Sequence, residues 1–204
     1  MARPPNILFI FTDQQRADTM ACYGNTLINA PNLNALASQS FVFENGYVSS
    51  PVCTPSRSTI MTGLWPHVNG CLMNNIPLDD SVLTIADLLT DEYRTAYYGK
   101  WHLGNEVIRQ HGFDEWLSIE DLYREYYNDP KYLSVFSDYH HFLIDNGYTP
   151  DKESEGAMVF SRGRAAALPE EMTKATFLGN QASKFIHDNR DRPFALYVNI
   201  FEPH

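Results

Sequence analysis

The stretch Asn6-Ile-Leu-Phe-Ile-Phe-Thr12 is a continuous apolar run built from β-branched and aromatic residues. Such a run, entered here through Pro4-Pro5, is typical of a buried strand in a parallel sheet. Asp13 and Gln14 follow directly, so the pattern places two polar side chains at the carboxyl end of this strand. The run therefore predicts both the type of sheet and the edge of the sheet where a functional site is expected.

Strand and helix patterns alternate along the rest of the chain. Strand-like runs occupy residues 41–46, 94–98 and 194–201, and apolar residues at helical spacing occupy 31–38, 81–89 and 170–189. This alternation predicts an α/β fold with a mostly parallel sheet flanked by helices. In such folds ligands bind at the carboxyl ends of the strands. Polar clusters follow three of the predicted strands at that edge: Asp13-Gln14, residues 99–102 and residues 202–204.

Residues 113 to about 164 break the alternation. The part from 121 to 148 holds six of the twelve tyrosines and lacks a clear helix or strand period. We expect an irregular or helical insertion here, either packed on the sheet or forming a pocket wall, where tyrosines can stack on sugar or aryl groups.

Composition excludes several classes of protein. The 204 residues carry a formal net charge of −10, and 44% of them are hydrophobic, which is typical of a globular domain and not of a disordered chain. An acidic chain is a poor match for nucleic acid or an anionic membrane surface, so neither partner is expected. No apolar run is long enough to span a bilayer or to form a usual secretory signal, so we expect a cytoplasmic protein.

The segment Cys53-Thr-Pro-Ser-Arg57 is the most specific in the chain. If residues 56–61 form a helix, its N-terminal N–H groups point toward Cys53, an environment that holds anions. Arg57 adds a permanent cation suited to tetrahedral oxyanions. From chemistry alone this is an anion-handling nucleophile site. Taken singly, Cys53 is equally an ordinary loop thiol and Arg57 a surface cation; the three cysteines show no CxxC pairing that would indicate a disulfide framework or a zinc ribbon.

The complete pattern, Cys-x-Pro-Ser-Arg followed by Met61-Thr-Gly63, resembles the signature of the type I sulfatases, formylglycine-dependent enzymes of the alkaline-phosphatase-like superfamily. Three further segments resemble the same family in the same order. The run 6–14 is similar to its first strand and metal-binding turn, Gly99-Lys-Trp-His-Leu-Gly104 to its second basic motif, and Phe201-Glu-Pro-His204 to a strand end that brings another histidine to the sulfate.

The resemblance implies a chemistry for residue 53. Formylglycine-generating enzyme would convert Cys53 to formylglycine, whose hydrated aldehyde attacks sulfur and then expels sulfate through a covalent sulfo-enzyme intermediate. Arg57, Lys100, His102 and His204 would be the other catalytic residues, with Lys100, His102 and His204 also binding the substrate, a small-molecule or carbohydrate sulfate ester. Viewed singly, Lys100 is also consistent with a solvated strand-end cation and His102 with a turn histidine.

The resemblance also implies a divalent metal, with calcium expected because its ligands would be Asp13, Gln14 and residue 53. Gln14 departs from the Asp-Asp pair common in the family and removes one negative charge. Further metal ligands and another lysine of the family have no counterpart before His204. Residues 1–204 are therefore expected to form the N-terminal part of a single sulfatase catalytic domain, incomplete at the C-terminus and with little activity alone.

Two alternatives stay open. Relatives with the same fold and cysteine signature hydrolyse phosphonate monoesters or phosphodiesters with similar groups. A truncated, inactive relative that only binds an anion or a partner is the other possibility.

Overall fold

The computed structural model describes residues 3–121, 124–127, 129–150, 153–154, 157–158 and 168–204. Its centre is a four-stranded, fully parallel sheet in the order β1-β6-β2-β3. The strands are β1 (Ile7–Thr12), β2 (Arg94–Gly99), β3 (Glu115–Leu117) and β6 (Phe194–Ile200). The predicted α/β class with a parallel sheet is confirmed, because β6 runs parallel to both of its neighbours.

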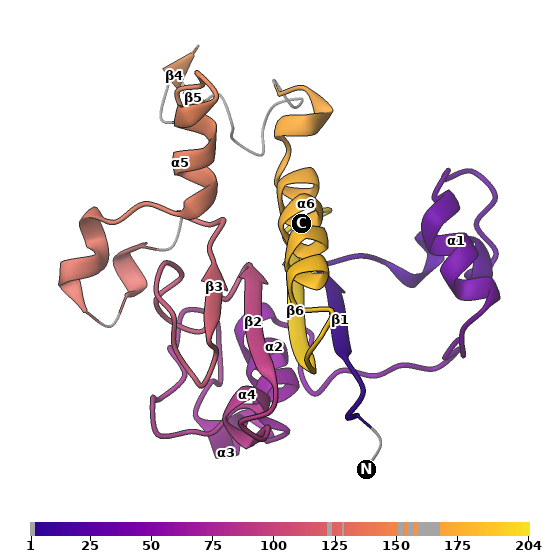
Figure 1. The fold of residues 1–204 in the computed structure, drawn as a ribbon, viewed down its shortest axis with the longest axis horizontal. Coiled ribbons are helices and arrows are strands. Elements are labelled where there is room, and N and C mark those ends of the chain that lie inside the picture. The colour runs from indigo at the N-terminus through magenta and orange to yellow at the C-terminus, as the bar shows by residue number, and fades with distance from the viewer. Residues whose placement is uncertain (1–2, 122–123, 128, 151–152, 155–156, 159–167) are drawn as a thin grey trace.

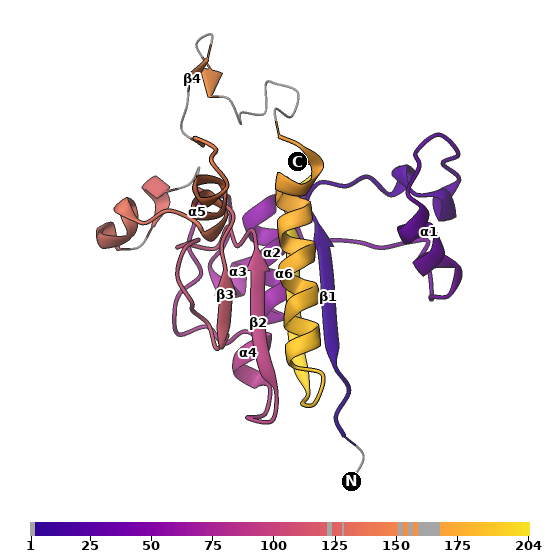
Figure 2. The same ribbon diagram turned by 45° about the horizontal axis from the view of Figure 1, so that its top comes forward.

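Helices cover both faces of the sheet (Figure 1 and Figure 2). One face packs on α6 (Lys174–Asp188) and α5 (Asp138–Asp145), the other on α2 (Cys53–Thr62) and α4 (Ile85–Leu88), and α3 (Pro66–Asn69) packs against α2. The remaining elements are α1 (Pro31–Ser38), the two-stranded antiparallel pair β4 (Glu153–Ser154) and β5 (Ala157–Met158), and the 3-10 turns η1 (Ala17–Thr19), η2 (Ala21–Tyr23), η3 (Arg124–Tyr126), η4 (Pro130–Ser134) and η5 (Glu170–Met172). Among the described residues, no helix has the length and apolarity needed to cross a membrane.

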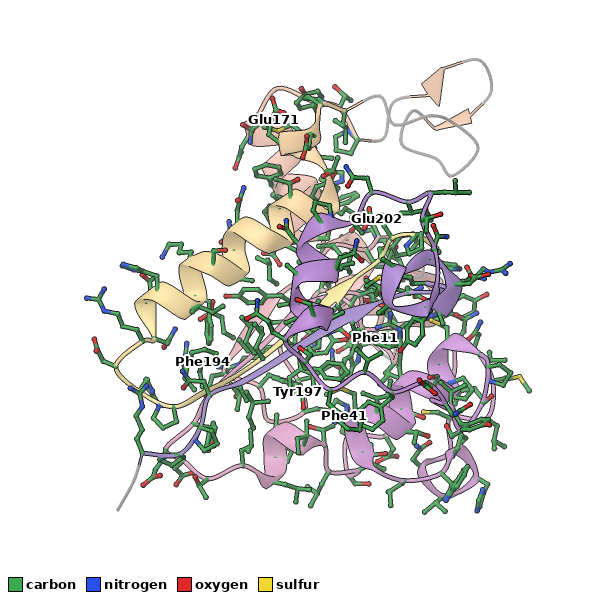
Figure 3. The ribbon with its side chains drawn as sticks, turned by 90° about the vertical axis from the view of Figure 1, so that its right-hand side faces the viewer. Phe11, Phe41, Glu171, Phe194, Tyr197 and Glu202 are labelled. Carbon is green, nitrogen blue, oxygen red and sulfur yellow. The ribbon has the colours of Figure 1, made fainter. Side chains whose placement is uncertain are left out.

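Two apolar clusters hold these layers together. Alternate residues of β2 and β6 point to opposite faces of the sheet, as strand geometry requires. Leu196 and Val198 of β6 pack on Leu178 of α6, whereas Tyr97 and Tyr197 pack with Trp101, Phe113 and Met61 on the other side. The carboxyl ends of β1 and β6 lie together, and Figure 3 shows Phe11 and Glu202 toward the same end, opposite Phe194.

The sequence predicts that residues 6–12 form a buried strand. The strand is confirmed as β1, but the prediction that it is buried is wrong. β1 lies at the edge of the sheet, and Leu8 and Ile10 are half exposed. They share a face with Leu196 and Val198 of β6, their register partners, but α6 lies over β6 and β2. An edge strand is covered only when an element packs beside it, which its own sequence does not show.

The strand predicted at 41–46 is wrong. Phe41 and Phe43 are largely exposed and stack edge-on against each other, and the Phe43 carbonyl accepts a hydrogen bond from the Tyr23 hydroxyl instead of from a neighbouring strand. The segment has strand-forming residues but no strand beside it. A strand pattern specifies a strand only when the fold supplies a pairing partner.

All three predicted helices are present, one with the predicted bounds and two with changed bounds. Residues 31–38 match α1, which begins at Pro31. The helix predicted at 81–89 shortens to α4, because Thr84 and Asp87 form a capping box that starts the helix there. The predicted 170–189 helix is divided into η5 and α6, since the Thr173 side chain caps the start of α6 by accepting the N–H of Thr176.

Part of the 113–164 segment belongs to the sheet. β3 pairs with β2 and was not expected, because three residues are too few to show a strand period. α5 gives this segment its helical part. Residues 122–123, 128, 151–152, 155–156 and 159–164, which fall within the predicted insertion, lie outside the described residues.

Candidate active site at the carboxyl edge of the sheet

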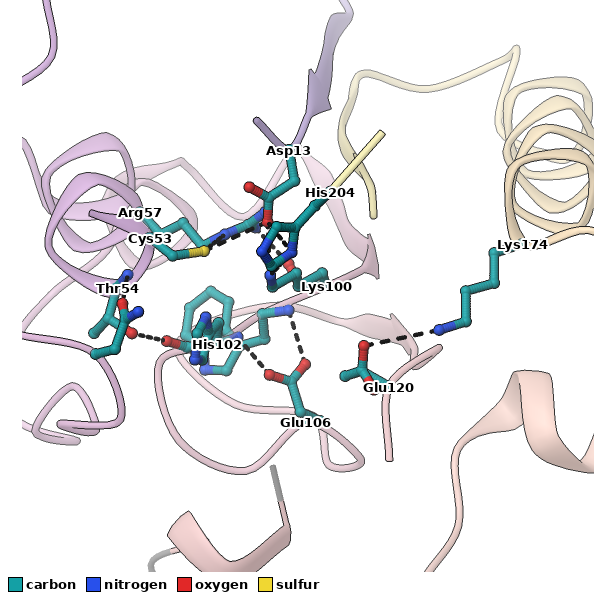
Figure 4. Close-up of polar contacts among 12 residues, drawn as sticks. Asp13, Cys53, Thr54, Arg57, Lys100, His102, Glu106, Glu120, Lys174 and His204 are labelled. Carbon is teal, nitrogen blue, oxygen red and sulfur yellow. Dashed lines mark hydrogen bonds and ion pairs between the residues drawn. The ribbon is translucent and has the colours of Figure 1, made fainter. Parts of the chain in front are cut away.

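The site is built around Asp13, at the carboxyl end of β1. Its backbone N–H donates to the Ile200 carbonyl at 3.1 Å, so the β1–β6 pairing fixes its position. The contacts that the described residues make to its carboxylate go to one oxygen, Oδ2. Four groups of the described residues reach this atom: Lys100 Nζ at 2.7 Å, Arg57 Nη2 at 3.1 Å, Cys53 Sγ at 3.4 Å and His204 Nδ1 at 4.0 Å (Figure 4).

These partners keep Asp13 ionised. Burial raises the pKa of the Asp13 carboxyl, but the hydrogen bond from Lys100 and the charges of Arg57 and Lys100 outweigh it and lower the pKa to about 2. Arg57 and Lys100 are both buried, so the two cations and the carboxylate form one buried ionic cluster. The cluster carries one net positive charge, which favours an anionic ligand.

Cys53 is the first residue of α2. The predicted helix 56–61 therefore extends further in both directions, from Cys53 to Thr62. Arg57 lies one turn later, and its Nε donates to Cys53 Sγ at 3.4 Å while its Nη1 donates to the Lys100 carbonyl at 2.7 Å. One arginine thus connects the thiol, the Asp13 carboxylate and the strand-end segment after β2. This geometry matches the anion-handling interpretation of the segment and does not match a surface cation.

Lys100 follows β2, and its side chain is fully buried, which rules out the solvated strand-end interpretation. The turn before it needs glycine: Gly99 has φ 104°, and a Cβ there would lie 2.0 Å from the Asn199 carbonyl oxygen. The Lys100 ammonium lies 3.3 Å from His204 Nδ1 and 4.7 Å from the centre of the Phe201 ring. The residues after β6 and those after β2 therefore meet, as the sequence predicts.

His102 is buried close to this cluster and has a neutral ring. Burial, and then the charges of Lys100 and Arg57, lower the pKa of His102 to about 3. Its Nε2 lies 2.9 Å from Asn75 Oδ1, and its carbonyl accepts a hydrogen bond from Thr54 Oγ1 at 2.8 Å. His102 is thus bound to the start of α2 and to the segment after α3.

A cavity of about 420 Å³ opens beside the cluster. Asp13, Gln14, Cys53, Arg57 and His204 line it, together with residues of the segments 48–52 and 11–15 and with Asn74. Cys53 and His204 therefore have access to a ligand, whereas Lys100 is buried behind them. The cavity is large enough for a small anionic group with its attached sugar or aryl ring.

The residues expected to bind a metal supply an incomplete ligand set. Gln14 is exposed, with φ 60°, and lines the same cavity as Asp13. No group of three or more His, Cys, Asp or Glu residues that could hold a metal occurs within the described part of the chain. Calcium prefers six to eight oxygen ligands, and Asp13 Oδ2 is already in contact with two cations. These residues alone do not make a calcium site, so no catalytic step is assigned to a metal.

Sequence analysis missed the residues that support this cluster. Asn74 Oδ1 accepts the Thr54 N–H at 3.0 Å, Asn75 binds the His102 ring, and Glu106 accepts hydrogen bonds from the backbone of the 99–104 loop. The two asparagines lie in a loop without a spacing pattern. The φ of 66° at Asn75, a conformation that asparagine tolerates well, is visible only in the structure.

Comparison with known proteins places the chain in a family. The Sulfatase family model matches residues 5–204, and the chain belongs to the sulfatase family. It is 36% identical over 168 residues to an N-acetylglucosamine-6-O-sulfatase of Bacteroides thetaiotaomicron, an alignment that covers 81% of this chain and 29% of that protein.

Two solved structures show the same fold. One, described as a complex with its substrate D-glucosamine-2-N,6-O-disulfate, has a TM-score of 0.69 and 28% identity over 98% of this chain and 35% of that one. The other is a phosphonate monoester hydrolase of Agrobacterium radiobacter, with a TM-score of 0.66, 22% identity and coverage of 98% and 41%. The second likeness is one of fold alone. The chain spans about a third of the length of these relatives.

Proposed function

We propose that the protein hydrolyses sulfate esters of carbohydrates, with residue 53 as the nucleophile after formylglycine-generating enzyme has converted Cys53 to formylglycine. The observation that carries this proposal is the convergence of Cys53, Arg57, Lys100 and His204 on Asp13 beside the cavity. The carbohydrate class is supported by the sugar sulfates named for two of the relatives.

Arg57 and Lys100 provide the positive charge for the sulfuryl oxygens. Arg57 is held by Asp13, by the Lys100 carbonyl and by Cys53, so its guanidinium is fixed before a substrate arrives. A fixed donor stabilises the charge that develops during the reaction without reorganising. Lys100 acts from behind Asp13 and His204, where its buried charge keeps the cluster positive.

His204 is the histidine with access to the cavity, and we assign to it proton transfer to the leaving oxygen. His102 is the second histidine of the site; its ring is neutral and is held by Asn75. A formylglycine at residue 53, hydrated by one water molecule, would supply the attacking hydroxyl. Asp13 holds Lys100 and Arg57 in place beside it and, with Gln14, offers oxygen atoms to a divalent metal.

The test combines peptide mass mapping with turnover. Protein from its native host is mapped for the state of residue 53 and assayed on N-acetylglucosamine 6-sulfate and on a phenylphosphonate ester. We expect an aldehyde at residue 53 and faster hydrolysis of the sulfate ester. Cys53→Ala should lower that turnover at least about 10³-fold because the nucleophile is lost, whereas Cys22→Ala, at an exposed free cysteine, should leave it unchanged.

Two other outcomes contradict the proposal. Preferential hydrolysis of the phosphonate ester would assign the protein to phosphorus chemistry. An unmodified thiol with no turnover of either ester, together with binding of inorganic sulfate, would make it a relative that only binds.

A further inference from the structure

A buried carboxylate outside the ionic cluster holds the loop that carries Lys100 and His102. Glu106 is fully buried, and its two oxygens accept hydrogen bonds from adjacent backbone N–H groups, Oε2 from Trp101 at 2.8 Å and Oε1 from His102 at 2.5 Å (Figure 4). We propose that Glu106 is a positioning residue that fixes the orientation of His102 in the site. This inference rests on the proposed function for its effect on catalysis, but not for its effect on His102.

His102 needs such a constraint because its backbone has φ 56°, in the left-handed region that residues with a side chain rarely adopt. Contacts to Glu106, Thr54 and Asn75 help to hold it there. Glu106 accepts its N–H, Thr54 Oγ1 donates to its carbonyl at 2.8 Å, and Asn75 meets its ring at 2.9 Å. We expect that loss of the first contact lets the peptide between Trp101 and His102 shift, and that the imidazole shifts with it.

The same loop carries Lys100, two residues earlier. The Lys100 carbonyl accepts hydrogen bonds from Arg57 Nη1 at 2.7 Å and from the Tyr97 hydroxyl at 2.6 Å. The backbone is therefore fixed on one side of Trp101 by Arg57 and Tyr97, and on the other side by Glu106. The buried indole of Trp101 packs between these two anchors, edge-on against Tyr97.

Glu106 is itself held in place. Its carbonyl accepts a hydrogen bond from Trp116 Nε1 at 2.7 Å, and Trp116 packs on the Tyr97 ring. Burial and the charge of Glu120 raise the pKa of the Glu106 carboxyl, the N–H bonds from Trp101 and His102 lower it, and the net result is a pKa of about 7. Burying a carboxylate is costly, so its retention at this point is consistent with a specific task.

A carboxylate suits this task better than an amide. Both of its oxygens accept, so one side chain can satisfy two adjacent N–H groups. Glutamine has the same shape but one acceptor oxygen, and its NH₂ group would face one of the two N–H groups. The variant Glu106→Gln therefore removes one anchor with almost no change in volume.

The experiment compares Glu106→Gln with Glu120→Gln in the whole protein. Glu120 is equally buried, but its Oε1 accepts the N–H of Asp121 and its Oε2 lies 3.7 Å from Lys174 Nζ, so it serves as the matched control. The first readout is the ¹⁵N NMR signals of the His102 imidazole without substrate. The second is kcat and KM for N-acetylglucosamine 6-sulfate. Thermal unfolding of each variant is recorded alongside.

We expect Glu106→Gln to shift the His102 signals and to lower kcat by about 10²-fold with little change in KM, because a misplaced group costs rate more than binding. Glu120→Gln removes a charge that raises the Glu106 pKa and so favours the ionised Glu106 carboxylate; it should therefore leave the signals and both kinetic constants as in the wild type. The proposal is overturned if Glu106→Gln leaves the His102 signals unmoved, whatever its thermal stability.

If Glu106→Gln does not fold, Trp116→Phe provides a second test, since it removes the indole N–H that holds the Glu106 carbonyl and replaces the indole by a smaller ring against Tyr97. It should move the His102 signals in the same way but less, and unmoved signals overturn the proposal. Because the NMR readout needs no substrate, a shift in a protein that hydrolyses no sulfate ester supports the role of Glu106 and contradicts the proposed function alone.

Discussion

Two segments of the chain reverse the usual relation between polarity and burial. In the loop after β2, the charged residues Lys100 and Glu106 are both 0% exposed. In the segment between β1 and α2, by contrast, the apolar residues Leu27, Phe41 and Tyr47 are 92%, 82% and 92% exposed. Residue type alone would predict the opposite in each segment.

The difference is one of position relative to the sheet. The first part of the loop after β2 contacts α2 through Lys100 and His102, and residues 100–103, 105 and 106 are buried there. The segment around α1 extends away from the sheet, as both ribbon views show (Figure 1 and Figure 2). Buried charges survive in the loop because each has a partner: Asp13 for Lys100, and two N–H groups for Glu106. Topology, more than polarity, decides which side chains this molecule encloses.

The largest expected effect compares two phenylalanines. Phe113→Ala empties a position packed against Tyr97, Trp116 and Tyr197 and should lower the free energy of unfolding by about 3–5 kcal/mol. Phe41→Ala removes an exposed ring and should change it by less than about 0.5 kcal/mol. Urea denaturation measures both. Equal losses would mean that the segment around Phe41 is packed as firmly as the core.

A smaller effect compares two aspartates five residues apart. Asp13→Asn leaves Arg57 and Lys100 buried without their carboxylate and should cost about 3 kcal/mol. Asp18→Asn breaks an ion pair with Arg16 on the surface and should leave the midpoint of urea denaturation unchanged. A harmless Asp13→Asn would show that the buried cluster does not need its charge balance.

The smallest effect concerns protonation. Burial and the two nearby cations hold the pKa of His102 at about 3, below its ordinary value of 6.5, so the ring stays neutral in the folded protein at pH 5. Protonation then favours the unfolded chain, and the contribution of His102 to stability is complete above pH 6.5 and lost as the pH falls toward 3. A ¹⁵N NMR titration checks this, and an imidazolium signal for His102 at pH 5 would contradict it.

The sequence was sufficient for much of this site. Apolar runs located β1, β2 and β6, and because parallel strands end at one edge, Asp13, Lys100 and His204 could be expected to meet there. The spacing of Cys53 and Arg57 also favours contact between the two side chains, since one turn of α2 separates them.

Other features depended on contacts that no local pattern records. β1 is at the edge because none of the described strands pairs with its other side, and the segment at Phe41 forms no strand because no described strand pairs with it. Asn75 and Glu106 support the site through single side-chain contacts with His102, and a lone Asn or Glu in a loop has no period to detect.

The strand order has a consequence for the time at which the site forms. β6 lies between β1 and β2 but comes last of the three along the chain, so β1 and β2, whose ends carry Asp13 and Lys100, enter one sheet through pairing with residues 194–200. At about 5–20 residues per second, a ribosome needs roughly 7 s or more to proceed from Cys53 to β6. During that interval the cysteine emerges on a chain whose sheet cannot close. Under the proposed function, the order of the strands would therefore set the time in which an enzyme could modify residue 53 in an extended peptide.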